Sequence, residues 1–211
     1  MMRFGVLVIS AGLLGLLSFT LLAVAVGTEY WYIIDADHVI NSSWHFASSH
    51  SGLWRIYEGK NGSFHDISFY MDTSEFSEQE KHLLNLHRII VILLPLSLVL
   101  LIFGGIFGLV GSLARSYTFL TGVAVYFLIC SLFTLSGVCI YVSYSQQALD
   151  ELRRLVSAEL LAHIHMSFGW SLASACISYA LEVACGILLM LAARLAYLEL
   201  HRESTAAFSM A

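Results

Sequence analysis

Four long apolar runs dominate the chain, and its polar residues gather between them. The runs cover Phe4–Gly27, Ile89–Ala114, Tyr117–Tyr144 and Phe168–Ala193. The first three contain no charged residue, and the fourth contains only Glu182. About 20 apolar residues cross the hydrocarbon of a bilayer, where each backbone amide must be paired within its own segment. The pattern therefore predicts four transmembrane helices, over about 4–27, 89–114, 117–144 and 168–200.

The segments between the runs are unequal: a long loop over 28–88, a short connection at Arg115-Ser116 and a medium loop over 145–167. Four helices place both termini on one side of the membrane. Basic residues are denser beside the termini, which favours a cytoplasmic position for both ends of the chain. The long loop is then extracellular, and its sequons predict glycosylation at Asn41 and Asn61. The first run is longer than the apolar core of a signal peptide, so we expect an uncleaved helix in a multi-pass plasma-membrane protein.

Three stretches of the long loop have the aromatic and β-branched composition of strands: Glu29–Ile34, Ser51–Tyr57 and Phe64–Tyr70. Asn61-Gly62 lies between the last two and is typical of a hairpin turn. Ser74–His87 is predicted as a helix leading into the second span, and the leucine spacing of Asp150–His163 continues the third helix to about 163. We predict an all-α membrane protein with a small extracellular β-sheet, organised as one domain over 1–211.

Composition narrows the class further. Hydrophobic residues make up 58% and charged residues 12% of the 211 residues, with a net charge of −5 and a mean hydropathy of +0.79. Soluble domains carry about twice that share of charge, and both disorder and nucleic-acid binding require more charge than this chain has. The sequence contains no phosphate-binding loop, no HExxH motif and no recognisable Ser-His-Asp set, and its four cysteines lack metal-ligand spacing. We therefore expect no catalytic residues, no metal and no cofactor.

A tryptophan just after the first span, followed by Gly-Leu-Trp, is a family pattern. Here it is Trp31 and Gly52-Leu53-Trp54. With four spans and two outer loops, the chain resembles the superfamily of claudins, peripheral myelin protein and calcium-channel gamma subunits, which includes relatives that regulate AMPA receptors. The resemblance implies a claudin-like left-handed four-helix bundle in which these motif residues have a structural role. Further segments resemble the group of transmembrane proteins 235 and 114: Tyr30–Ile33, Ser48–Arg55, Leu93–Leu98 and Ser167–Ser171.

The chain departs from this pattern at two positions. The family has a cysteine shortly after Gly-Leu-Trp and a second one further on, which form a disulfide across the hairpin. This chain has Tyr57 at the first position and Ser63 where the second aligns. Ser63 also completes the Asn61 sequon, so a glycan is expected close to where the family has its bridge.

Two features inside the spans point to helix contacts. An acid such as Glu182 is costly in the middle of a helix that crosses the membrane. It either pairs with a polar group of a neighbouring helix or contacts a partner's helix, whereas a transport pathway would require further intramembrane charges. Gly104 and Gly108 have the spacing that lets helices approach closely, within the bundle or toward another membrane protein.

Two classes of function follow from the resemblance. In the first, the protein is an auxiliary subunit that binds a channel or receptor laterally, through its outer sheet and its membrane helices. In the second, it is a junction protein whose sheet meets the same protein on another cell or beside it. A membrane-organising tetraspan is a third reading. The expected partners are membrane lipids and a membrane protein or the chain itself, and not nucleic acid.

Overall fold

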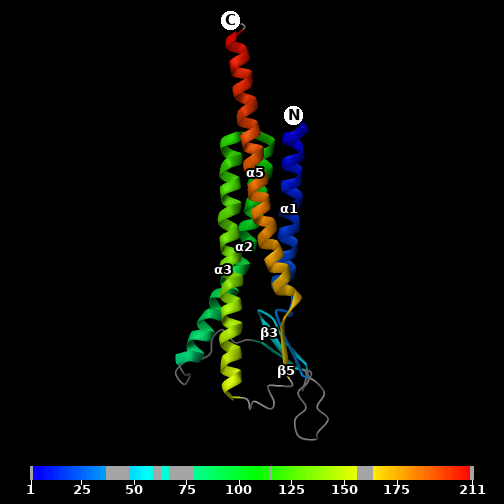
Figure 1. Cartoon of the computed structure of the whole chain (residues 1–211), viewed down its shortest axis with the longest axis vertical. Helices are drawn as coiled ribbons and strands as arrows, with labels where there is room; N and C mark the ends of the chain where they lie inside the picture. Colours follow the sequence, from blue (N-terminus) through cyan, green and yellow to red (C-terminus); the bar gives the residue numbers. More distant parts are fainter. Residues whose placement is uncertain are drawn as a thin grey trace. The chain divides into compact units, whose positions relative to one another are not determined.

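The computed structural model describes residues 2–36, 48–58, 63–66, 78–114, 116–155 and 164–209. Within this part of the chain lie four helices: α1 (Met2–Gly27), α2 (Glu78–Ala114), α3 (Tyr117–Leu155) and α5 (Trp170–Ser209) (Figure 1). Each includes a stretch long and apolar enough to cross a membrane: Phe4–Gly27, Lys81–Ala114, Tyr117–Asp150 and Trp170–Arg202. The four predicted spans are therefore confirmed.

Helices α2, α3 and α5 extend by more than ten residues beyond the apolar runs, and α1 begins two residues before its run. The predicted helix before the second span is continuous with that span, and α2 begins at Glu78. Helix α3 reaches Leu155, and its predicted continuation over 156–163 lies outside the described residues. Helix α5 ends at Ser209, past the predicted end near 200, and it begins at Trp170 rather than at Phe168. The reason for the later start is that the backbone N–H of Gly169 donates to Trp31 O, which draws this segment into the sheet.

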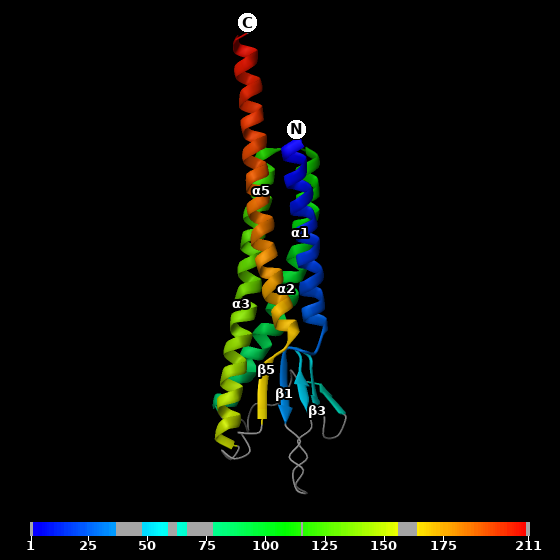
Figure 2. The same cartoon turned by 45° about the vertical axis from the view of Figure 1, so that its right-hand side comes forward.

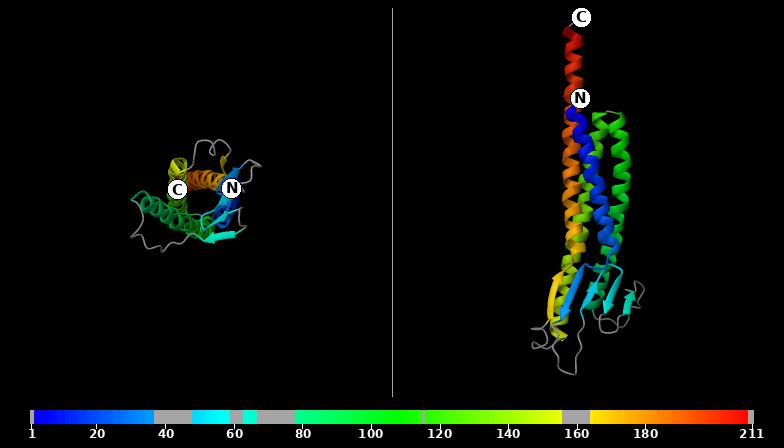
Figure 3. Two further views of the ribbon diagram at one scale, coloured as in Figure 1. Left: turned by 90° about the horizontal axis from the view of Figure 1, so that it is seen from below. Right: turned by 90° about the vertical axis from the view of Figure 1, so that its right-hand side faces the viewer.

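The sheet contains five described strands: β1 (Tyr32–Ala36), β2 (Ser49–Ser51), β3 (Arg55–Glu58), β4 (Ser63–Asp66) and β5 (Ile164–Phe168). Their order is β4-β3-β2-β1-β5, and every neighbouring pair is antiparallel. Figures 2 and 3 show the strands side by side. The small antiparallel sheet predicted from the sequence is confirmed.

The second predicted loop, 145–167, is not a plain loop, because it contributes the edge strand β5. This strand pairs with β1 over five positions, from Tyr32 opposite Phe168 to Ala36 opposite Ile164. The sequence Ile-His-Met-Ser-Phe of β5 alternates apolar and polar residues, which is the period of a strand. That signal was available in the sequence and was missed.

The predicted strand Ser51–Tyr57 is also wrong as one strand. Ser51 ends β2 and Arg55 begins β3, and the Gly52 N–H donates to Arg55 O over 2.9 Å to close a turn between them. Strands β3 and β4 pair antiparallel as the predicted hairpin, and its turn over 59–62 lies outside the described residues, as do positions 67–70 of the third predicted strand.

The chain divides into two compact units. Unit 1 comprises Met1–Leu22, Leu96–Thr134 and Ile177–Ala211, and unit 2 comprises Ala23–Pro95 and Leu135–Cys176. Unit 1 is built from helix segments alone, and the start of α1 and the end of α5 lie at the same end of it as the junction of α2 and α3 (Figure 1). Unit 2 contains the sheet, and buried side chains in its core include Trp31, Leu53, Ile90, Leu94 and Tyr141.

Candidate functional site

The two motif tryptophans cap the end of helix α1. The last carbonyls of a helix have no partner within it and require donors from elsewhere. The Trp31 indole N–H donates to Ala25 O over 2.7 Å, and the Trp54 indole N–H donates to Val26 O over 2.9 Å. The Thr28 hydroxyl donates to Val24 O over 2.7 Å. The motif therefore joins the first span to the sheet through successive carbonyls of one helix end.

Trp31 also anchors the sheet to α3. Its side chain is fully buried, and its ring centroid lies 4.6 Å from that of Tyr141. Its backbone N–H donates to Ser51 O in β2, and its backbone oxygen accepts from Gly169 after β5. One residue thus connects β2, the chain after β5, α1 and α3.

The Gly52-Leu53-Trp54 turn has a steric reason for each of its first two residues. A Cβ atom added to Gly52 would lie 2.6 Å from the backbone Cα of Glu29, so only glycine fits at this close approach. The Leu53 side chain is fully buried in unit 2. The turn is therefore packed against the chain that leaves α1, and it is not a free loop.

Aromatic rings form a continuous column across the sheet, which we call the aromatic stack and define as Tyr57, His50, Tyr30 and Trp170. Tyr57 lies over His50 with centroids 4.7 Å apart, and His50 lies over Tyr30 at 4.5 Å with an interplanar angle of 7°. Tyr30 is 6.1 Å from Trp170 at the start of α5. Tyr30 is 41% exposed and Trp170 is 48% exposed, so this end of the stack lies at the surface of unit 2. Sequence reasoning missed the stack, because its rings come from four separate segments.

Glu182 lies in a cluster of hydroxyl groups inside unit 1. The Thr134 hydroxyl lies 3.0 Å from both carboxylate oxygens, and the Ser178 hydroxyl donates to Oε1 over 3.3 Å. The Ser18 and Ser178 hydroxyls are 2.9 Å apart. All four side chains are buried, and they come from α1, α3 and α5. Of the two readings of Glu182, this geometry supports pairing with neighbouring helices of the same chain, because the side chain is not open to a partner.

The two candidate glycines of α2 differ in their surroundings. A Cβ on Gly104 would lie 3.1 Å from Tyr126 and 3.2 Å from Phe127, so this glycine allows α2 to approach α3 closely. A Cβ on Gly108 would meet only Val123, at an ordinary 3.8 Å. In both cases the near neighbour belongs to α3 of the same chain.

Titratable groups in the described part of the chain form no cluster of three or more His, Cys, Asp or Glu side chains that could hold a metal ion. Asp150 and Arg153 form an exposed ion pair over 3.5 Å.

In the sheet, burial raises the pKa of Tyr32 above its usual value, and the positive charge of Arg153 partly opposes this shift. The Tyr32 hydroxyl is buried and has no hydrogen-bond partner among the described residues.

The family profile described as PMP-22/EMP/MP20/Claudin tight junction matches residues 16–191. This match covers the sheet, the capping tryptophans, the second and third spans, the second half of the first span and most of the fourth. The chain belongs to this family.

Curated relatives of this claudin-family chain include calcium-channel subunits. It is 28% identical over 177 residues to the human voltage-dependent calcium channel gamma-5 subunit, covering 80% of this chain and 63% of that protein. The mouse gamma-5 subunit is 29% identical over 178 residues, and the human gamma-4 subunit is 25% identical over 188 residues. The chain spans less than two thirds of the length of these relatives, at 63%, 63% and 56% respectively.

The positions of the family disulfide are occupied differently here. Tyr57 pairs with Phe64 across the β3–β4 ladder, and Ser63 pairs with Glu58, so the two aligned positions are not directly opposite each other. Instead of a bridge to β4, the Tyr57 ring stacks on His50 of β2. The predicted glycosylation sites Asn41 and Asn61 lie outside the described residues.

Proposed function

We propose that this claudin-family protein is a non-enzymatic auxiliary subunit that binds an ion channel or receptor laterally in the plasma membrane. The observation that carries the proposal is the similarity to calcium-channel gamma subunits over 80% of this chain. We further propose that the chain is one claudin-like domain with cytoplasmic termini, an extracellular sheet and glycans at Asn41 and Asn61.

The proposed contact outside the membrane is the open end of the aromatic stack. Large aromatic side chains contribute strongly to protein interfaces because they bury much apolar area at a low cost in conformational entropy. Tyr30 and Trp170 are each more than one third exposed, at 41% and 48%, and they belong to the segments that leave α1 and enter α5. A partner seated there would contact the sheet and the outer end of two spans together.

The proposed contact inside the membrane is the outward face of α3 and α5. Val125, Ile129 and Leu132 form an exposed apolar stripe on α3, and Ile187 and Leu191 are exposed on α5. Modulation requires that the partner's states offer different contacts to these surfaces, since a ligand shifts an equilibrium only through its differential affinity. The subunit would then favour the channel state that covers the stack and the stripe more completely.

The test is co-purification from cells that express the tagged chain with a voltage-dependent calcium channel or, separately, with an AMPA-type receptor. We expect a stoichiometric complex in mild detergent with one of them. Trp170→Ala should weaken it by at least about tenfold, the factor that corresponds to about 1.4 kcal/mol. Tyr117→Ala is the matched control, because Tyr117 is a similarly exposed aromatic residue (38%) that belongs to unit 1. Equal recovery of wild type and Trp170→Ala would contradict the proposed surface, and recovery of neither channel nor receptor would contradict the auxiliary role.

A junction protein is the second candidate, because the matching family profile carries the description claudin tight junction. In that case the same aromatic surface would meet another copy of this chain. Cells that express the protein alone would then adhere to one another and concentrate it at their contacts.

A further inference from the structure

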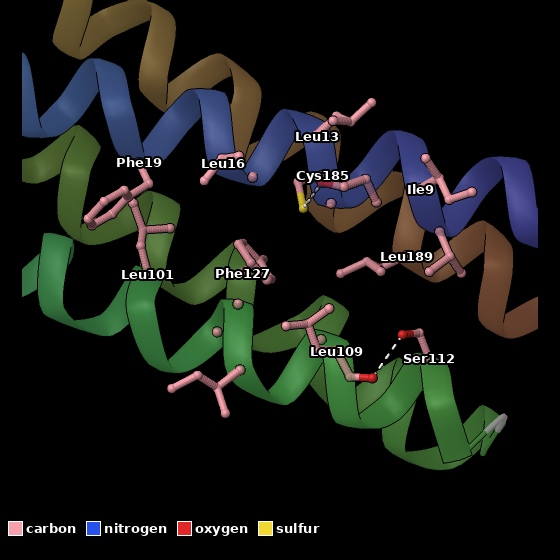
Figure 4. A pocket seen from close by; sticks show the side chains of 18 of the residues that line it. Ile9, Leu13, Leu16, Phe19, Leu101, Leu109, Ser112, Phe127, Cys185 and Leu189 are labelled. Carbon is pink, nitrogen blue, oxygen red and sulfur yellow. Dashed lines mark hydrogen bonds between the residues drawn. The ribbon is translucent and has the colours of Figure 1, made fainter.

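Unit 1 contains an apolar groove between α1 and α2 with a volume of about 540 Å³. Figure 4 shows Ile9, Leu13 and Leu16 of α1 on one wall and Leu101 and Leu109 of α2 on the other. Phe127 of α3 and Cys185 and Leu189 of α5 lie between the walls. The groove is distinct from the Glu182 cluster, none of whose four residues lines it.

The chemistry of the lining points to a hydrocarbon ligand. Of the nineteen lining residues, only Ser112 and Cys185 have polar side-chain atoms, and both already donate within the chain. The Ser112 hydroxyl donates to Leu109 O over 2.9 Å, and the Cys185 thiol donates to Ala11 O over 3.2 Å. A ligand with several buried polar groups would find no free donor on these side chains and few acceptors, so most of those groups would incur their desolvation cost.

The length of the groove points to one leaflet. Its walls run from Val8 to Phe19 on α1 and from Leu101 to Ser112 on α2. Each wall rises by about 16 Å at 1.5 Å per residue. This is close to half of the hydrocarbon core, which is about 30 Å thick. Ser112 lies two residues before the end of α2, so the groove begins at the end of α2 that adjoins α3 and runs about 16 Å along the helix.

We propose that this groove binds one acyl chain of a phospholipid from the leaflet on the side of the chain termini. A partner's transmembrane helix is a poorer fit, because it would cross the full hydrocarbon core, about twice the length of the groove. An acyl chain is narrow, flexible and as long as one leaflet is deep. It fills the space between α1 and α2 and restores the dispersion contacts that an empty groove would lack.

Substitutions at two glycines that line the groove would fill it with a side chain without a clash with the rest of the protein. A Cβ on Gly12 or on Gly105 would meet no atom within 4 Å, and both residues line the groove. Gly12→Leu and Gly105→Leu therefore place a side chain where the acyl chain lies. Gly122→Leu is the matched control, because Gly122 also has open space around it and does not line the groove.

The experiment uses the full chain in nanodiscs that contain a phosphatidylcholine with a photoactivatable diazirine in its acyl chain. After illumination, labelled peptides are mapped by mass spectrometry. We expect wild-type labelling to concentrate on the groove residues of α1 and α2. Each groove variant should lower that labelling by at least about tenfold, which corresponds to about 1.4 kcal/mol of lost binding, while Gly122→Leu leaves it unchanged.

Two outcomes would overturn the proposal. One is wild-type labelling spread evenly over all outward helix faces, which identifies the groove as ordinary lipid-facing surface. The other is a groove protected from lipid by a second protein helix, revealed by a crosslink between chains from a photoreactive residue at Leu13. The wild-type map decides the first outcome by itself, so that part of the test does not depend on any variant folding. The melting temperatures of the groove variants and of the Leu13 variant are measured beside it.

Discussion

At the scale of single residues, the family motif works by satisfying a helix end. Trp31 and Trp54 donate to adjacent carbonyls at the end of α1, and Gly52 lets the β2–β3 turn approach the chain that follows. The sequence resemblance predicted a structural role for these residues without a reason for it. That reason was not accessible from the sequence, because the donors and acceptors lie up to 28 positions apart.

Gly52→Ala tests the close approach directly. The added methyl group would press on the Glu29 backbone, so we expect a loss of about 1–3 kcal/mol of unfolding free energy, as for overpacking elsewhere. Thermal unfolding of the purified protein in detergent measures it. Gly27→Ala is the matched control at the end of α1, where an added Cβ meets nothing within 4 Å. If both variants melt at the same temperature, the steric account of the motif fails.

Tyr32→Phe tests the buried hydroxyl. Burial raises the pKa of Tyr32, so the folded state holds this proton more tightly than the unfolded state does. The contribution of Tyr32 to the free energy of unfolding is therefore fully present below the pKa of the unfolded state, near 10. It is lost as the pH rises through the higher pKa of the folded state. We expect Tyr32→Phe to flatten this alkaline loss, and to raise stability by about 1 kcal/mol at neutral pH by removing an unpaired hydroxyl.

Melting curves at pH 7 and at about pH 10.5, just above the ordinary tyrosine value, give both quantities. Tyr117→Phe provides the control for a tyrosine outside the sheet. An alkaline loss that is the same in wild type and Tyr32→Phe would show that another group is responsible.

At the scale of elements, the helices were predictable and the sheet was predictable in part. An apolar run of 20 residues is a local signal, so each span was found from its own sequence. Strand β5 has a local strand pattern that was missed, whereas its pairing with β1 had no local signal, because it joins positions more than 120 residues apart, as with Tyr32 and Phe168. Glu182 was singled out as costly, but its partner Thr134, and Ser18 that contacts Ser178 beside it, belong to other helices and had no signal that linked them to it.

A double-mutant cycle tests whether the Glu182 cluster clamps α3 to α5. Hydrogen bonds between transmembrane helices contribute about 0.6 kcal/mol on average and up to about 1.7 kcal/mol. We expect Thr134→Val and Glu182→Leu each to lower stability modestly, and their coupling energy to fall within this range. Leu132→Val serves as the control, because the Leu132 side chain is exposed on the same helix as the buried Thr134. A coupling energy of zero would show that the contact between Thr134 and Glu182 does not stabilise the packing of α3 against α5.

At the scale of the whole molecule, the two units contain different candidate sites. The helices of unit 1 hold a closed polar cluster and an open apolar groove, and the sheet of unit 2 presents aromatic rings beside the segments that enter α5 and leave α1. The absent family disulfide is compatible with this sheet, since Trp31 and the stacked Tyr57 tie its strands by other means. A buried Glu182 also predicts that partner binding survives Glu182→Gln, whose amide oxygen still accepts from Thr134.

The most direct test of the auxiliary role is a current recording. A voltage-dependent calcium channel or an AMPA-type receptor is expressed alone, with the wild-type chain, with Trp170→Ala and with Tyr117→Ala. We predict that the wild-type chain and Tyr117→Ala shift the gating or the amplitude of one of these currents, and that Trp170→Ala loses most of the shift at equal surface expression. Unchanged currents for both partners, together with adhesion between cells that express the chain alone, would contradict the account and favour a junction protein.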